Sequence, residues 1–246
     1  MCRSLTFLLL ALGLTVPVWA GDKALEIVRR IDSNESFKTE SFQATMTIQK
    51  GSRTLTKVFF GFGQREGRKS FMEFTNPEDR GVKYLKLDNE MWIFFPDADD
   101  VMKISGHMLR QGMMGSDLSY EDMLENESLE ERYQAVLLQD ETVDNRACNV
   151  VELTAKRPDL TYERQKIFVD QERFVPLRLE LYARGGRLLK RMSQEEVTRI
   201  GDRWVPLRIT IQDLRRKDSK TVVAFQEIKF DVALPKDVFT KQYLMR

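Results

Sequence analysis

Histidine and cysteine are scarce in this sequence, which has one histidine, His107, and two cysteines, Cys2 and Cys148. One imidazole cannot build a zinc site that needs two or three, and any Ser-His catalytic triad would have to use His107. With so few cysteines a disulfide framework is excluded, so stability must come from a hydrophobic core. Cys148 lies beside Val150 and Val151, and we interpret it as part of that core.

Net charge and long apolar runs are lacking as well. The chain has 39 basic and 38 acidic side chains, and their interspersed signs argue against nucleic acid as the main partner. Beyond residue 20, no segment approaches the roughly 20 continuous apolar residues of a membrane-spanning helix. Asp97, Asp99 and Asp100 lack the glycine hinge and later glutamate of a calcium loop, so they indicate a turn. We therefore expect no metal and no other cofactor.

Residues 1–20 have the pattern of a secretory signal peptide. Arg3 precedes an apolar run, and Ala20 supplies the small residue before the expected cleavage site at Gly21. Cys2 comes before the apolar run, whereas the acylated cysteine of a lipoprotein would follow it. The pattern predicts a soluble, unacylated mature protein that begins at Gly21 in the periplasm.

The remaining chain, residues 21–246, contains no linker rich in proline, serine or glycine, which favours one domain. From residue 22 to about 34, apolar residues recur at helical spacing and predict an amphipathic helix. From Phe42 to Phe230 the period changes to two, in short segments separated by turn residues. This pattern predicts roughly eleven antiparallel strands. A sheet of that size must curl into a barrel or fold into a sandwich.

Five of the 11 methionines fall within residues 102–123, where three glycines interrupt them. Methionine is flexible and polarizable, so the cluster suits a surface that repacks around variable cargo, but it suits an ordinary core equally well. After this cluster, Ser119 begins a predicted short helix. Asp122 lies three residues later in a capping box, and we assign Ser116 and Asp117 to the same cap.

The segment from Arg80 to Met123 carries four motifs in a fixed order: YLK at 84–86, WIFFP at 92–96, KISG at 103–106 and GSDLSYED at 115–122. This order resembles the LolA-like family of outer-membrane lipoprotein-sorting proteins. The resemblance implies an incomplete antiparallel β-barrel with an N-terminal helix and a short helical lid on its concave face. Acyl chains would bind between the sheet and the lid.

For this chain, the resemblance implies a fixed wall that includes Ile93 and Phe95, and a mobile segment that includes Met113 and Met114. The acyl-chain contacts expected on this basis are Met91, Ile93, Phe95, Met102, Ile104, Met108, Met113, Met114 and Leu118. The resemblance also implies a monomeric, non-enzymatic carrier in the periplasm. It would receive lipids or lipoproteins from an inner-membrane transporter, of the RND type for relatives of this length, and deliver them to an outer-membrane acceptor.

Two other classes of function stay open. An adaptor subunit of an envelope transporter would have an apolar groove filled by its own helices. A hydrolase would use His107 with a carboxylate. The chain is longer than the best-known family members, with extra hairpins after Arg157, so free lipid and lipoprotein are both open as cargo.

Overall fold

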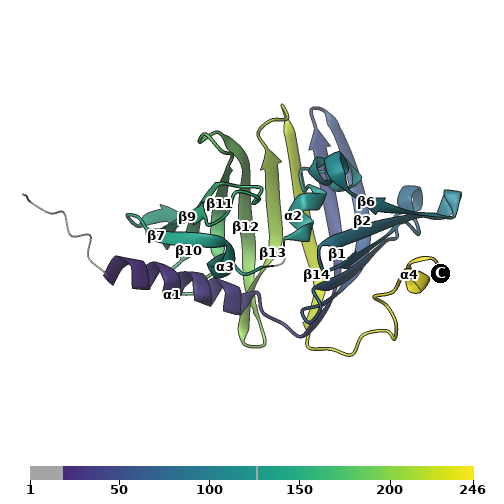
Figure 1. Ribbon diagram of the computed structural model, residues 1–246, viewed down its shortest axis with the longest axis horizontal. Coiled ribbons are helices and arrows are strands. Elements are labelled where there is room, and N and C mark those ends of the chain that lie inside the picture. Colours follow the sequence, from purple (N-terminus) through teal and green to yellow (C-terminus); the bar gives the residue numbers. More distant parts are fainter. Residues whose placement is uncertain (1–18, 126) are drawn as a thin grey trace, which may run out of the picture.

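The computed structural model describes residues 19–125 and 127–246, which form an N-terminal helix and one large antiparallel sheet (Figure 1). Apart from residues 19 and 20, the expected signal peptide lies outside the described residues. The first half of the chain contains α1 (Trp19–Asn34), β1 (Thr39–Lys50), β2 (Arg53–Gln64), β3 (Lys69–Phe74), β4 (Lys83–Leu87), β5 (Glu90–Phe95) and β6 (Asp100–Ile104). The second half contains β7 (Tyr133–Leu137), β8 (Glu141–Val143), β9 (Arg146–Ala155), β10 (Arg164–Asp170), β11 (Pro176–Tyr182), β12 (Leu188–Ile200), β13 (Arg203–Asp213), β14 (Ser219–Phe230) and α4 (Lys241–Leu244).

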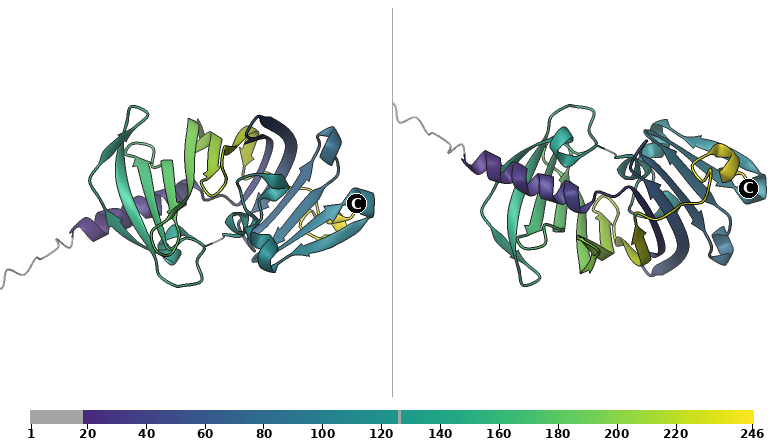
Figure 2. Two further views of the ribbon diagram at one scale, coloured as in Figure 1. Left: turned by 90° about the horizontal axis from the view of Figure 1, so that it is seen from above. Right: turned by 90° about the horizontal axis from the view of Figure 1, so that it is seen from below.

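The sheet is continuous and open. Its order is β6-β5-β4-β3-β2-β1-β14-β13-β12-β11-β10-β9-β7, with β8 paired to β9. The middle of the sheet therefore joins the first and last strands of the chain, from Glu40 opposite Phe230 to Lys50 opposite Ser219. Seen from above and below, the sheet curls into two wings without closing (Figure 2).

The predicted incomplete antiparallel barrel is thus confirmed, although it has 14 strands where about eleven were expected. Part of the difference is β8, which has only three residues and therefore shows no apolar alternation. In the described part of the chain, no helix has the length and apolar character needed to span a membrane.

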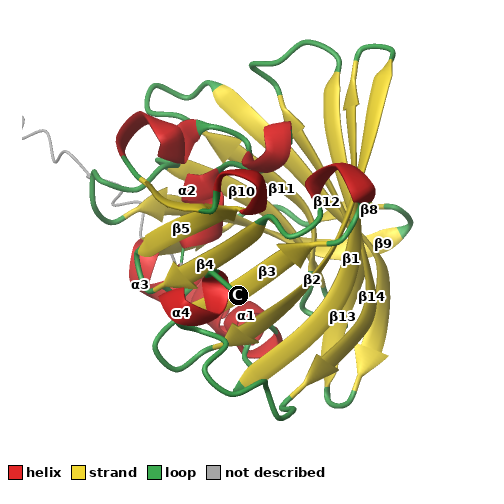
Figure 3. Cartoon of the chain, turned by 90° about the vertical axis from the view of Figure 1, so that its right-hand side faces the viewer, coloured by secondary structure: helices red, strands yellow, loops and turns green. Residues whose placement is uncertain are grey.

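The first wing, β1 to β6, is covered on both faces. Successive side chains of β5 point to opposite sides. Ile93 is buried on the concave side, while Trp92 is buried on the convex side against the C-terminal residues Val238 and Leu244. Figure 3 shows α4 lying against this convex side. A strand that is apolar on both faces is explained by this double covering.

The second wing, β7 to β13, is covered on one face by α1. The helix buries the stripe Ala24, Ile27, Val28 and Ile31 against β7, β9 and β10, as the helical periodicity predicts. It begins at Trp19, slightly before the predicted start. Cys148 is fully buried in a separate cluster of this wing, which confirms its place in the core.

Candidate functional site

The concave face of the first wing is covered by the segment after β6, residues 105–124, which we call the lid. It contains the short helices η3 (Gly106–Arg110), η4 (Met113–Gly115) and α2 (Tyr120–Leu124). Figures 1 and 2 show these helices on the inner side of the wing. The chain then reaches α3 (Leu129–Arg132), beside α1, and enters the second wing. The lid therefore lies on the apolar concave face of the first wing.

Eight of the nine expected acyl-chain contacts belong to one hydrophobic cluster under the lid. The buried members are Met91, Ile93, Ile104 and Met113, and the partly buried members are Met102, Met108, Met114 and Leu118. Their contact with cargo stays a prediction. The cluster also contains aromatic residues outside the list of expected contacts, including Phe74, Tyr84 and Tyr120. Phe74 and Tyr84 belong to the run of aromatic residues between Phe59 and Phe95, which predicts a bulky wall in the first half of the sheet.

Phe95 does not join this wall. It is 37% exposed, because it is the last residue of β5 and the 3₁₀ turn η2 (Pro96–Ala98) follows at once. Phe95 follows Ile93 by two residues, so both side chains point to the same face of the strand. The segment that covers this face does not extend to the end of the strand. The expectation that Phe95 forms part of the fixed wall is wrong for this reason.

Asp117 fastens the lid to the central strand β14. Its carboxylate accepts hydrogen bonds from Ser219 Oγ at 2.7 Å and from Thr221 Oγ1 at 2.8 Å, while its backbone N–H donates to Thr221 Oγ1 at 2.9 Å. Ser116 Oγ accepts from the N–H of Leu118 at 3.2 Å. The expected role of Ser116 and Asp117 as caps of α2 is therefore corrected: one closes a local turn and the other ties the lid to the sheet.

Ser119 and Asp122 do form the predicted capping box at α2. The Ser119 N–H and hydroxyl both donate to the Asp122 carboxylate, at 2.8 and 2.6 Å. The same carboxylate accepts from Tyr162 Oη at 2.5 Å and forms a buried ion pair with Lys190 of β12, whose Nζ also donates to Ser119 Oγ at 3.1 Å. Lys190 is only 1% exposed. The cap therefore also links the lid to the second wing.

A hollow of about 690 Å³ remains where the far end of the lid faces the sheet. Its apolar lining comes from Phe37, Phe42, Phe62, Met72 and Met123. Lys86 Nζ donates to the carbonyl of Met123 at 2.6 Å, which ties this end of the lid to β4. The hollow therefore lies beside the surface that the lid covers, and we call it the entrance hollow.

Two glycines of β2 help to shape this entrance. Phe42 lies over Gly61 and Glu40 lies over Gly63, so closely that a Cβ at either glycine would be 2.5 Å from the neighbouring side chain. A side chain at either position would push Phe42 or Glu40 out of place. The sequence alone does not predict a role for these glycines, because the need for them arises only from the pairing of β1 with β2.

Three charged groups that line the entrance hollow, Glu35, Glu40 and Lys86, have shifted pKa values. Burial raises the pKa of Glu40 to about 7. Glu35 is exposed where it lines the hollow, and partial desolvation by the protein atoms around it, together with the nearby Asp32, raises its pKa to about 7. Burial lowers the pKa of Lys86 to about 8. These groups therefore change charge near neutral pH.

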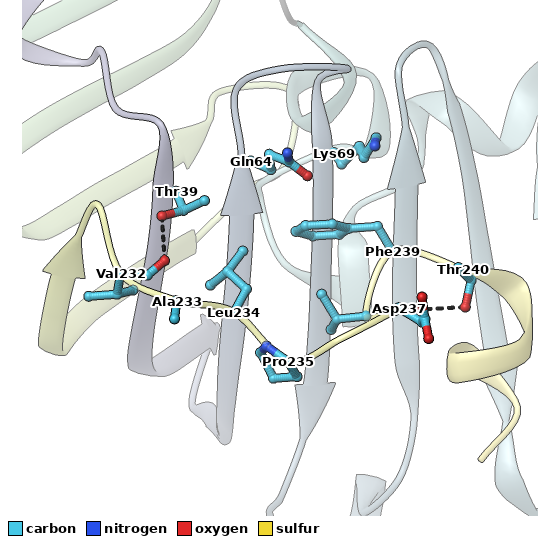
Figure 4. A pocket seen from close by; sticks show the side chains of 11 residues that line it. Thr39, Gln64, Lys69, Val232, Ala233, Leu234, Pro235, Asp237, Phe239 and Thr240 are labelled. Carbon is cyan, nitrogen blue, oxygen red and sulfur yellow. Dashed lines mark hydrogen bonds between the residues drawn. The ribbon is translucent and has the colours of Figure 1, made fainter.

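His107 is exposed on η3. Among the described residues, no group of three or more histidine, cysteine, aspartate or glutamate side chains has the geometry of a metal site. A separate hollow of about 480 Å³ lies on the convex side, under residues 232–240 (Figure 4). There Thr39 Oγ1 donates to the carbonyl of Val232 at 2.6 Å, and the segment runs along the strands as a cover.

Comparison with known proteins identifies the family. A family model described as "Uncharacterized protein" matches residues 66–246, well over half of the chain, and the chain belongs to this family, DUF1329. It is similar to the crystal structure of a DUF1329 family protein from Desulfovibrio piger, with 26% identity, a TM-score of 0.84 and coverage of 92% of this chain and 99% of that one.

Two further solved structures have the same fold. One is a putative outer membrane lipoprotein-sorting protein domain from Vibrio parahaemolyticus (23% identity, TM-score 0.81, 92% and 100% coverage). The other is a LolA superfamily protein from Nitrosomonas europaea (23% identity, TM-score 0.73, 89% and 98% coverage). The resemblance to LolA-like proteins is confirmed. No curated protein matches the chain.

Proposed function

We propose that the protein is a periplasmic carrier that binds the acyl chains of lipids or lipoproteins between the lid and the concave face of the first wing. It moves them between the inner and outer membranes, taking them from an inner-membrane transporter of the RND type and passing them to an outer-membrane acceptor. The chain performs this role as a monomer and without catalysis. The lipoprotein-sorting description of the Vibrio parahaemolyticus structure supports this assignment.

One observation carries the proposal: a methionine-rich segment covers an apolar sheet face, and polar contacts from Asp117, Asp122 and Lys86 tether it at a few points. Met108 and Met114 of the lid are only partly buried against the cluster, so they can repack around a guest. Burying each CH₂ group is worth about 0.8 kcal/mol, so a few acyl chains would bind strongly without a covalent step. Displacing the lid from the sheet would open the required space beside the entrance.

The direct test is to purify the protein from its native envelope and to analyse organic extracts by mass spectrometry. We expect stoichiometric lipid or acylated protein in the extract, and loss of that material from the variant Met114→Asp. A variant with the same charge change at an exposed methionine outside the lid, Met245→Asp, serves as the control. Extracts free of acyl compounds, together with no binding of added lipid, would reject the carrier.

The adaptor alternative also has an observation in its favour. Met113 is 2% exposed and Met91 is 1% exposed, so the lid itself fills this part of the groove. An adaptor would keep the lid in place permanently. A disulfide that joins the lid to the sheet would then leave function in the envelope intact, whereas in a carrier it would abolish lipid uptake.

A further inference from the structure

A second hollow, about 530 Å³, lies at the opposite end of the lid, where the β1–β2 and β13–β14 turns meet residues 111–115. Figure 1 shows the lid helices beside these strand ends. Its side chains include three cations, Lys50, Arg216 and Lys217, and no acid. The remaining lining residues are Gln111, Gly112, Gly115 and Ser219. From this arrangement we propose a binding site for a phosphate group, a function that goes beyond acyl-chain binding.

The three cations come from separate parts of the chain and converge on one space. Lys50 ends β1 opposite Ser219, and its ammonium lies 3.2 Å from where a Cβ of Gly115 would stand. Like charges held close together repel, which costs free energy that a bound anion would recover. Lys50 and Lys217 are exposed, and neither forms an ion pair among the described residues. Both ammonium groups are therefore available to a ligand.

Among the three cations, Arg216 is the one whose side chain is held in a fixed orientation by contacts with the protein. Its Nη1 donates to the carbonyl of Ser116 at 2.8 Å, and its Nε lies 3.6 Å from Asp213 Oδ2. The guanidinium fits there because residue 112 is glycine: a Cβ at Gly112 would lie 3.2 Å from Arg216 Nη1 and would collide with the Ser116 carbonyl. A planar guanidinium fixed on one edge still presents other N–H groups to a phosphate oxygen.

Nearby acids offset this charge only in part. Asp213 forms an ion pair with Arg216 at 3.6 Å, and the exposed Asp218 follows Lys217 in the same turn but does not line the hollow. The Asp213 carboxylate is already engaged by Arg215, with contacts of 2.8 and 2.7 Å. Asp117 is 1% exposed and accepts from two hydroxyls of β14. Neither carboxylate lines the hollow. The cavity therefore has a positive lining, hydrogen-bond donors and enough room for a tetrahedral anion.

The phosphate could belong to a lipid headgroup or to a small soluble ester, since the chemistry is the same. Two probes separate these sources. Glycerol 3-phosphate tests the soluble group by calorimetric titration. Dihexanoyl phosphatidic acid, compared with dihexanoyl glycerol, tests the headgroup at constant acyl chains. The variant is Lys50→Gln with Lys217→Gln, and the control of equal charge change is Arg187→Gln with Lys236→Gln, two exposed cations that do not line the hollow.

We expect the wild type and the control to bind a phosphate probe with the same affinity, and the Lys50/Lys217 variant to bind it at least tenfold more weakly. Affinity should also fall as ionic strength rises. Binding of glycerol 3-phosphate assigns the site to a soluble ester. Preference for phosphatidic acid over the neutral lipid, without binding of glycerol 3-phosphate, assigns it to a headgroup.

Absence of binding to both phosphate probes, or equal weakening in the variant and the control, would overturn the proposal. Circular dichroism checks that the variants are folded, which we expect because both lysines are exposed. The outcome does not depend on the carrier hypothesis, because glycerol 3-phosphate has no acyl chain. Conversely, loss or retention of acyl binding in Met114→Asp would support or reject only the carrier hypothesis, because Met114 does not line the phosphate site.

Discussion

Asp117 of the lid and Thr221 of β14 bond each other twice, since the Asp117 N–H donates to Thr221 Oγ1 at 2.9 Å and the Thr221 hydroxyl donates to Asp117 Oδ2 at 2.8 Å. Both residues are almost fully buried, and 104 positions of sequence separate them. This reciprocal contact holds the lid to the middle of the sheet, where the first and last strands pair. A variant that lacks this contact should therefore have a more mobile lid, while the sheet stays folded.

Asp117→Ala should lower the free energy of unfolding by about 2–4 kcal/mol, because two buried hydroxyls lose their acceptor. Asp117→Asn keeps one acceptor oxygen and should lose less. Urea denaturation measures both effects, and hydrogen exchange should show faster exchange at the Met113 N–H, which donates to the Leu118 carbonyl within the lid. Unchanged exchange at Met113 in Asp117→Ala would mean that the lid is held by other contacts.

Met114→Asp should separate cargo binding from folding. Met114 is partly buried and has a φ of +50°, a conformation that aspartate adopts more readily than methionine, so the free energy of unfolding should change by no more than about 1 kcal/mol. A carboxylate buried beside acyl chains costs several kcal/mol, so affinity for a lipid analogue should fall about a thousandfold or more. Both quantities are measured on one preparation, by fluorescence titration and thermal unfolding. Unchanged affinity would show that the methionine cluster is part of the hydrophobic core and does not contact cargo.

Phe95→Ala should cost less than about 1.5 kcal/mol of stability, because Phe95 is 37% exposed at a strand end. The matched substitution Phe74→Ala removes a fully buried ring from the cluster under the lid and should cost about 3–5 kcal/mol. Urea unfolding of the two variants provides the comparison. Similar losses for both would place Phe95 in the core after all.

Lys190→Met should destabilise the fold by about 3–5 kcal/mol, because it leaves the Asp122 carboxylate buried without its cation. Adding Asp122→Asn removes that charge, so the double variant should recover part of the loss. The exposed Lys23→Met is the control and should change stability by less than about 0.5 kcal/mol. A double-mutant cycle from urea unfolding measures the coupling, and additive effects would show that the two residues act independently.

Glu40 should make stability depend on pH near neutrality. Its pKa rises from 4.5 to about 7 on folding, so the folded chain binds more protons than the unfolded chain between these values. The contribution to stability is complete below about pH 4.5 and is lost as pH rises through about 7. Relative to the wild type, Glu40→Gln should be more stable at pH 8 by a margin that shrinks toward pH 4.5. Urea midpoints across this range test the trend, and parallel curves would contradict it.

Glu35 has its own raised pKa of about 7, so Glu40→Gln should reduce the pH dependence without abolishing it. Asp32, Arg65 and Arg132 also influence Glu35 electrostatically. The double variant with Glu35→Gln should flatten the stability curve further. If the second substitution added nothing, Glu35 would be as solvated in the folded chain as in the unfolded one.

The sequence by itself determined the features that depend on neighbouring residues. The stripe from Ala24 to Ile31 determined the helix face, and alternation from Phe42 onward determined the strands, because each period fixes which side chains share a face. Ser119 and Asp122 form their capping box within three positions. The motifs between Arg80 and Met123 further indicated the family and hence the lid, a step that rests on resemblance and not on local physics.

Tertiary structure alone decided the contacts between distant segments. Lys190 pairs with Asp122 across 68 positions of sequence, and Asp117 bonds Thr221 across 104. The identity of a charged or hydroxyl side chain does not indicate which distant residue it will contact. Phe95 points to the same face of β5 as Ile93, yet it is exposed because the lid does not extend over the end of the strand. The phosphate site proposed above likewise exists only because the pairing of β1 with β14 brings Lys50 to the Arg216 turn. Local periodicity specifies faces, whereas burial and charge pairing depend on which faces the folded chain brings together.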